Sequence, residues 1–167
     1  MLFDFEKIED FDKHIELSIP NYSGLVDIVD SLFLEFMPEG GFCVDIGCST
    51  GKLLHSFSER RSANYTGVDV VDMPRFSGFD FVKSSASGYL SEIERADFIT
   101  SIFTLQFMNG IERKKVLRHF ARLVNGGAFL IIAEKVYVDD VVINSVLNKR
   151  HYAEKRKHFS DKEIMDK

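Results

Sequence analysis

The chain has 167 residues, of which 45% are apolar and 28% charged, a composition that excludes a disordered chain and indicates a soluble globular protein. Its length predicts one domain over residues 1–167, and its formal net charge is −5. No apolar run approaches the roughly 18 residues that cross a membrane, and the acidic N-terminus argues against a secretory signal, so we expect a cytoplasmic protein without membrane contact.

Apolar periodicity predicts helices and strands that alternate along the chain. Helices are expected over residues 23–36, 52–61, 111–124 and 141–158. Strands are expected over residues 42–46, 64–70, 79–83, 96–103 and 128–136, with a short helix over 89–95. This alternation predicts an α/β fold with a doubly wound, mostly parallel sheet, whose ligand crevice lies at the carboxyl ends of the strands.

The two ends of the chain differ in charge. Residues 1–40 hold ten Asp or Glu and two Lys, whereas residues 149–167 hold seven Lys or Arg and four acids. Both stretches fit the solvated faces of amphipathic helices. Alternatively, the basic stretch contacts RNA or an acidic partner.

The cysteines and histidines form no pattern that predicts chemistry. Cys43 and Cys48 flank the end of the first predicted strand, and their spacing matches neither a disulfide framework nor a zinc site, so we expect reduced thiols. None of the five histidines pairs with a nucleophile or belongs to a cluster with metal-ligand spacing. We therefore assign no metal site and no catalytic residue.

A glycine-rich loop, GCSTGK (47–52), follows the first predicted strand and leads into a helix. A P-loop has four residues between its glycines and then Lys-Ser or Lys-Thr, whereas here three residues separate the glycines and a leucine follows the lysine. A dinucleotide fingerprint needs a glycine where Ser49 stands. ATP, GTP and NAD are therefore disfavoured as ligands.

The remaining interpretation is a D-x-G-x-x-x-G turn made by Asp45, Gly47 and Gly51. Such a bare turn lets the backbone touch a ligand that joins an amino acid to a nucleoside without a phosphate. Asp45 can then organise the loop amides or hold an ammonium group through water. Asp69 lies 22 residues after Gly47 at the end of the second strand, where a carboxylate can accept both ribose hydroxyls. The structural alternative is a tight turn and an Asp69 that caps the next segment.

Three motifs resemble those of the class I S-adenosylmethionine-dependent methyltransferases: VDIGCSTG (44–51), TGVD (66–69) and LVNGGAFLIIAEK (123–135). Three further stretches are similar to the bacterial carboxy-S-adenosylmethionine synthases of tRNA wobble-uridine modification. They are SIPNYSGLV (18–26), DIGCS (45–49), and FTLQFM with the following ER (103–108 and 112–113). The similarity begins near Phe11 and covers nearly all of the chain. It implies a Rossmann-like fold with S-adenosyl-L-methionine as the cofactor.

The resemblance assigns cofactor contacts to the residues that match the family's motifs. Tyr22 of the NYS segment and the first residues of the glycine loop are expected to touch the cofactor. Asp69 is expected to hold the ribose, with Val70 beside the adenine. The expected contacts are Tyr22, Asp45, Gly47, Cys48, Ser49, Gly51, Asp69 and Val70.

Three further cofactor neighbours depart from the family's pattern. Ser85 and Ala86 stand where the family has an aspartate and an aliphatic residue that face the adenine amino group. A serine hydroxyl can still bond adenine, but more weakly than a carboxylate. Ile102 stands in place of an asparagine just before FTLQF, which removes a polar contact.

The class I fold normally closes its sheet with an antiparallel pair of strands. The related synthases place in that region an arginine that grips the carboxylate of carboxy-S-adenosylmethionine. The sequence ends at Lys167, ahead of those strands, so we expect residues 128–136 to form a sheet edge. Exposed edges are usually covered or paired, which predicts that either the 141–158 helix or a second subunit covers this one.

The resemblance implies a transferase that acts at the methyl group of S-adenosylmethionine, with the acceptor unknown. Methyl transfer from a sulfonium depends on positioning more than on acid–base groups. One alternative is a carboxy-S-adenosylmethionine synthase, which needs a cation for a prephenate-derived carboxylate, with Lys135 and Arg75 as candidates. The other alternative is a non-catalytic cofactor-binding or scaffold subunit.

Overall fold

The computed structural model describes residues 11–72 and 75–165. Backbone contacts divide the chain into two compact units. One unit is Val26–Lys135, and the other is formed by the segments that end at Leu25 and begin at Val136. The single domain expected over residues 1–167 stays a prediction.

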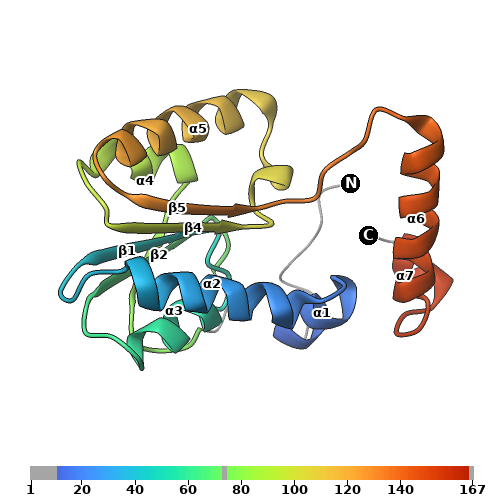
Figure 1. Ribbon diagram of the computed structural model, residues 1–167, viewed down its shortest axis with the longest axis horizontal. Coiled ribbons are helices and arrows are strands. Elements are labelled where there is room, and N and C mark those ends of the chain that lie inside the picture. Colours follow the sequence, from blue (N-terminus) through green and yellow to red (C-terminus); the bar gives the residue numbers. More distant parts are fainter. Residues whose placement is uncertain (1–10, 73–74, 166–167) are drawn as a thin grey trace. The chain divides into compact units, whose positions relative to one another are not determined.

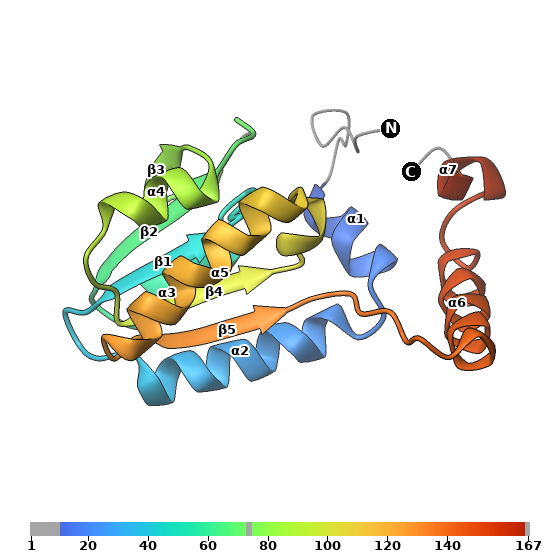
Figure 2. The same cartoon turned by 90° about the horizontal axis from the view of Figure 1, so that it is seen from above.

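Five parallel strands form one sheet in the order β3-β2-β1-β4-β5 (Figures 1 and 2). Their bounds are β1 Phe42–Ile46, β2 Asn64–Asp69, β3 Asp80–Lys83, β4 Phe98–Ile102 and β5 Phe129–Ala133. The chain order reverses at β1, which pairs with β2 on one side and β4 on the other (Figure 2). The carboxyl ends of these three strands frame the crevice in which open α/β sheets bind ligands. The predicted doubly wound α/β fold is confirmed.

Helices cover both faces of the sheet (Figure 1). One face carries α2 (Tyr22–Phe36) and α3 (Lys52–Ser58), and the other carries α4 (Ala86–Glu92) and α5 (Gly110–Asn125). Each connection from a strand through a helix to the next strand therefore delivers a loop to the same edge of the sheet. The glycine loop (47–51), Asp69 and Ser85 lie at the carboxyl ends of β1, β2 and β3 along that edge.

The two faces of the sheet have cores of different composition. Aromatic rings fill the face under α2 and α3, where Phe33 stacks on Phe57 at 3.9 Å and meets Phe98 edge-on at 5.5 Å. The other face is mainly aliphatic. Its buried side chains include Val44, Ile46, Val68, Leu90, Ile99, Val116, Phe120 and Leu123. Each large apolar side chain buried in this way stabilises the fold by roughly 1.5–3 kcal/mol, which fixes the strands that carry the site.

Helix boundaries differ from the predictions by a few residues. α3 ends at Ser58, α6 spans Val141–Lys155, and α4 begins at Ala86 because the preceding Ser85 caps it. Two short helices, α1 (Phe11–Ser18) and α7 (Asp161–Met165), were not predicted. α1 buries none of its side chains.

Among the described residues β5 pairs only with β4, so it forms one edge of the sheet, as the sequence predicted. Within residues 11–72 and 75–165 there is no antiparallel strand. α6 belongs to the other compact unit, so the cover of this edge by that helix or by a second subunit stays a prediction. In the described part of the chain, no helix combines the length and hydrophobicity that crossing a membrane requires.

Candidate functional site

The glycine loop between β1 and α3 is held against the end of β2. Its backbone adopts left-handed conformations at Gly47, Ser49 and Gly51, with φ angles of 80°, 51° and 74°. The N–H groups of Gly47 and Cys48 donate to the Val68 carbonyl at 2.7 and 3.2 Å. A left-handed conformation costs a non-glycine residue roughly 1–2 kcal/mol, so the fold holds Ser49 in this conformation against a local preference.

Gly47 and Gly51 are also required by close packing. A Cβ atom on Gly47 would lie 2.2 Å from Oγ1 of Thr104, and one on Gly51 would lie 2.0 Å from the ring of Phe79. The loop therefore packs directly on the turn after β4 and on the residue before β3. A side chain at either position would require the Thr104 side chain or the Phe79 ring to move.

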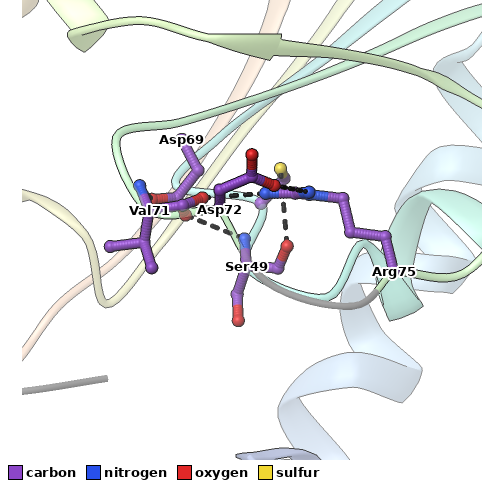
Figure 3. Close-up of polar contacts among 6 residues, drawn as sticks. Ser49, Asp69, Val71, Asp72 and Arg75 are labelled. Carbon is purple, nitrogen blue, oxygen red and sulfur yellow. Dashed lines mark hydrogen bonds and ion pairs between the residues drawn. The ribbon is translucent and has the colours of Figure 1, made fainter. Parts of the chain in front are cut away.

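Asp69 ends β2 and faces the glycine loop (Figure 3). Its Oδ2 accepts the Ser49 N–H at 2.9 Å, and its Oδ1 accepts the Val71 N–H at 3.0 Å. A carboxylate has about four acceptor positions, so each oxygen keeps capacity for a ligand hydroxyl. The loop and the acid that the sequence singled out are thus in direct contact.

Asp45 lies inside β1 and is 4% exposed. Its Oδ1 accepts the Thr100 hydroxyl at 2.7 Å. The amides at 47–49 donate to Val68 and Asp69, which corrects the expectation that Asp45 holds the loop amides. Burial raises the pKa of Asp45 to about 7, the Thr100 hydrogen bond opposes this rise, and the charge of Asp69 adds to it.

Arg75, one of the two predicted cations, lies beside the loop with its guanidinium already engaged (Figure 3). Its terminal nitrogens donate to the Asp72 carboxylate and the Val71 carbonyl, each at 2.8 Å. Its Cζ lies 3.3 Å from the centroid of the Phe81 ring, a cation–π contact. A substrate carboxylate would have to compete with Asp72 for this cation. Lys135, the other candidate, follows β5 and is exposed.

The first turn of α4 places a free donor next to a carboxylate. Ser85 caps the helix, and its Oγ accepts the Gly88 N–H at 3.1 Å. Glu112 of α5 reaches the same turn, where its two oxygens accept the Ser87 N–H at 3.0 Å and the Ser87 hydroxyl at 2.8 Å. Among the described residues, the Ala86 N–H has no acceptor.

The turn after β4 packs against the glycine loop through Thr104, whose side chain fills the space next to Gly47. The turn begins at Phe103, which has a left-handed φ of 53°, and continues as a 3₁₀ helix over Leu105–Phe107. Within this turn, the side-chain amide of Gln106 donates to the Phe103 carbonyl at 3.1 Å. This strained turn is a second wall of the crevice.

Glu134, the residue after β5, holds the backbone of this turn through a hydrogen bond. Its Oε1 accepts the Leu105 N–H at 2.5 Å. Burial raises the pKa of Glu134, while the backbone amides of the turn and the charge of Arg113 oppose the rise. Glu112 and Glu134 lie inside the family-like stretches ER (112–113) and LVNGGAFLIIAEK (123–135), but the resemblance assigned neither of them a role. A charged residue next to an apolar strand was the only signal for Glu134.

A family profile described as "Methyltransferase domain" matches residues 21–164. The chain belongs to the class I S-adenosylmethionine-dependent methyltransferase family. The methyltransferase domain is also similar to curated proteins named carboxy-S-adenosyl-L-methionine synthase. The protein from Staphylococcus epidermidis is 32% identical over 86% of this chain and 66% of its own length. The protein from Colwellia psychrerythraea is 30% identical over 99% of this chain and 73% of its own length. The chain thus spans about two thirds of the Staphylococcus relative.

Solved structures support the same fold for this methyltransferase domain. An N-methyltransferase from Bradyrhizobium japonicum in complex with S-adenosyl-L-homocysteine aligns with a TM-score of 0.58 at 14% identity, over 77% of this chain and 68% of that chain. The magnesium protoporphyrin IX methyltransferase from Synechocystis, also with S-adenosyl-L-homocysteine, aligns with a TM-score of 0.54 at 18% identity, over 86% of this chain and 67% of that chain.

The remaining predicted contact residues of the methyltransferase domain lie on different elements. Val70 follows β2 and is 63% exposed, and Ile102 ends β4 partly buried. Cys48 is a buried free thiol whose pKa is raised by burial and by the nearby carboxylates. Tyr22 begins α2 in the segment that ends at Leu25 and belongs to the other unit. Its cofactor contact stays a prediction.

Proposed function

We propose that this methyltransferase domain binds S-adenosyl-L-methionine across the glycine loop and Asp69 and transfers a group at the cofactor's methyl carbon. The observation that supports this most directly is the hydrogen bond from the Ser49 N–H to Asp69 Oδ2. It joins the loop to the carboxylate that can take the ribose hydroxyls. Since the loop lacks both phosphate-binding patterns, a nucleoside joined to an amino acid fits it better than a nucleotide does.

The unused polar groups of the site fit such a ligand. Each oxygen of Asp69 has capacity for one ribose hydroxyl. The Ala86 N–H lacks an acceptor among the described residues and can donate to a ring nitrogen of the base. The exposed side chain of Val70 offers the base an apolar surface, and the buried carboxyl group of Asp45 can ionise beside a cationic ligand.

When bound, S-adenosyl-L-methionine supplies a methyl group that its sulfonium already activates. The chain's own residues then need only hold the two reactants in line and exclude water. We assign the positioning of the acceptor to the turn after β4, because Thr104 packs this turn on Gly47 and Glu134 fixes its backbone. No general acid–base pair is required for this step.

A carboxy-S-adenosylmethionine synthase acting in tRNA wobble-uridine modification is the second candidate. The two similar proteins at 32% and 30% identity favour it. The engaged state of Arg75 and the exposure of Lys135 weigh against it, because a substrate carboxylate needs a cation inside the crevice. A third candidate is a non-catalytic scaffold that keeps the fold and acts by pairing along the open edge of β5.

Calorimetry with S-adenosyl-L-methionine tests the binding step. Asp69→Asn removes the negative charge at the ribose position and is expected to weaken binding at least tenfold, because hydrogen bonds to a charged acceptor contribute about 1.5–3 kcal/mol. Asp80→Asn is the matched control, since it removes the same charge from the opposite end of the neighbouring strand β3. If the wild-type protein takes up no cofactor, the enzyme proposal fails and the scaffold is favoured.

Mass spectrometry of the small molecules that copurify with the chain separates the two enzyme candidates. A retained carboxylated cofactor identifies a synthase, and plain S-adenosyl-L-methionine favours methyl transfer.

The partner proposals need separate measurements. Light scattering tests for a homodimer, and RNA binding tests the basic 149–167 stretch. In that stretch, Arg156 pairs with Asp161 at 2.7 Å and Lys157 pairs with Glu154 at 2.7 Å, which lowers the charge available to RNA.

A further inference from the structure

One face of α6 exposes apolar side chains along two successive turns. The side chains that are each at least half exposed there are Val142, Ile143, Val146 and Leu147. Their positions, i, i+1, i+4 and i+5, place them on one side of the helix as an apolar stripe. Asn144, Asn148 and His151 lie partly buried on the other side. Clustered apolar side chains on a protein surface are typical of an interaction site.

Charges of opposite sign stand at the two ends of the apolar stripe. Asp139 and Asp140 precede it, and Lys149 and Arg150 follow it. All four of these residues are exposed. Residues 141–148, which lie between them, carry no charge. Along its length the helix therefore presents an acidic end, an apolar centre and a basic end, in that order.

This order is complementary to itself when its direction is reversed, which is what a two-fold contact between identical surfaces requires. In an antiparallel pair of α6 helices centred on the stripe, Ile143 of one copy lies beside Leu147 of the other. Asp140 of one copy then lies beside Arg150 of the other, once on each side of the two-fold axis. We propose that this chain forms a homodimer in which α6 packs antiparallel against α6 of a second copy through the apolar stripe.

Charges and helix dipoles favour this arrangement over other occupants of the stripe. A parallel pair would place acidic ends together and basic ends together, and would align the two helix dipoles. An anionic membrane surface would attract Lys149 and Arg150 but repel Asp139 and Asp140. The antiparallel pair satisfies both ends. Because the contact covers only the short apolar stripe, it is small, and we expect a dimer that dissociates on dilution.

Sedimentation velocity over a range of protein concentrations measures the dissociation constant of the dimer. Val146→Asp places a charge in the centre of the stripe and is expected to raise this constant by roughly tenfold or more. Ser145→Asp is the matched control, because it adds the same charge to an exposed residue of the same helix outside the stripe. The control is expected to stay within about threefold of the wild-type constant.

Charge reversal tests the direction of the pair. Asp139→Arg and Arg150→Glu each bring like charges together at both ends and are expected to raise the dissociation constant by roughly 3- to 10-fold at low salt. The double variant restores opposite charges at both ends and should recover most of the affinity. Asp139 is preferred to Asp140 for this test because Asp140 caps the helix, with its Oδ1 accepting the Val142 and Ile143 amides at 2.9 Å.

Several results would overturn the inference. A wild-type chain that stays monomeric does so, and if this monomer binds vesicles of phosphatidylcholine and phosphatidylserine, a membrane surface is the occupant instead. A dimer that tolerates Val146→Asp but is dissociated by Ile132→Asp pairs along the edge of β5, where Ile132 is exposed. A double charge variant that binds no better than the single variants excludes the antiparallel direction. None of the expected cofactor contacts lies on α6, so these results leave the proposed function untouched.

Discussion

The Glu134 carboxylate accepts the Leu105 N–H at 2.5 Å and thereby ties the residue after β5 to the turn after β4. That turn packs on the glycine loop, because Thr104 fills the space beside Gly47. The contact links two neighbouring strand ends of the crevice through one side chain. Its removal should loosen the turn without touching the glycine loop directly.

We expect Glu134→Ala to lower the free energy of unfolding by about 1–3 kcal/mol, because the buried amide of Leu105 loses its acceptor. Glu134→Gln keeps a carbonyl oxygen in the same place and should cost less. Urea denaturation measures both values. Glu35→Ala on the exposed side of α2 provides the control and should change stability by less than about 0.5 kcal/mol. Equal stabilities for the Glu134 and Glu35 variants would contradict this role of Glu134.

A comparison of Gly51, in the glycine loop, with Gly40, before β1, separates the cost of a steric clash from the cost of backbone strain. Gly40 and Gly51 have similar left-handed φ angles of 67° and 74°, but a Cβ on Gly40 meets nothing within 4 Å, whereas one on Gly51 would lie 2.0 Å from Phe79. Gly40→Ala is expected to cost roughly 1–2 kcal/mol, the strain alone. Gly51→Ala should destabilise the protein by at least about 2 kcal/mol more, because packing clashes add to the strain. Thermal and urea unfolding of the two variants would show the difference, and matching values would contradict the close packing on Phe79.

Much of the sheet unit could be predicted from local patterns. Apolar runs such as FCVDI and FLIIA located the strands, and the distance from Gly47 to Asp69 placed the acid opposite the loop. These features depend on neighbours in sequence or on the fixed geometry of a parallel sheet, in which all carboxyl ends meet at one edge.

The supporting carboxylates could not be predicted in the same way. Glu112 contacts Ser87 across 25 residues, and Glu134 contacts Leu105 across 29 residues. No periodicity encodes such a contact, because it depends on which helix start or turn the fold brings beside the side chain. The contacts of Arg75 with Asp72 and Val71 are local in sequence, three and four residues apart, but they lie in a loop where no periodicity predicts side-chain direction.

The buried carboxyl group of Asp45 should make stability depend on pH. Its pKa is raised from 3.8 to about 7 in the fold, mainly by burial, so the folded state binds more protons than the unfolded state between these values. Stability contributed by this group is therefore present at low pH and is lost as pH rises toward 7. The slope is at most about 1.4 kcal/mol per pH unit. Unfolding measured from pH 4 to 8 should show a smaller decline in Asp45→Asn, and an identical pH profile would contradict the raised pKa.

The same carboxyl group should couple proton release to cofactor binding. A sulfonium and an ammonium group near Asp45 favour its ionised form, so binding lowers its pKa and releases a proton wherever the free protein is protonated. The affinity for S-adenosyl-L-methionine should therefore rise by up to about tenfold per pH unit below pH 7 and level off above it.

Calorimetry between pH 5.5 and 7 in buffers of different ionisation enthalpy measures both the affinity and the proton released. An α-amino group stays largely protonated in this range, since its pKa is about 7.7–8.0, so the ligand's own titration contributes little. Asp45→Asn should bind with an affinity that changes little with pH and should release no proton. Proton uptake on binding to the wild-type chain would reverse the predicted sign and place the cationic end of the cofactor away from Asp45.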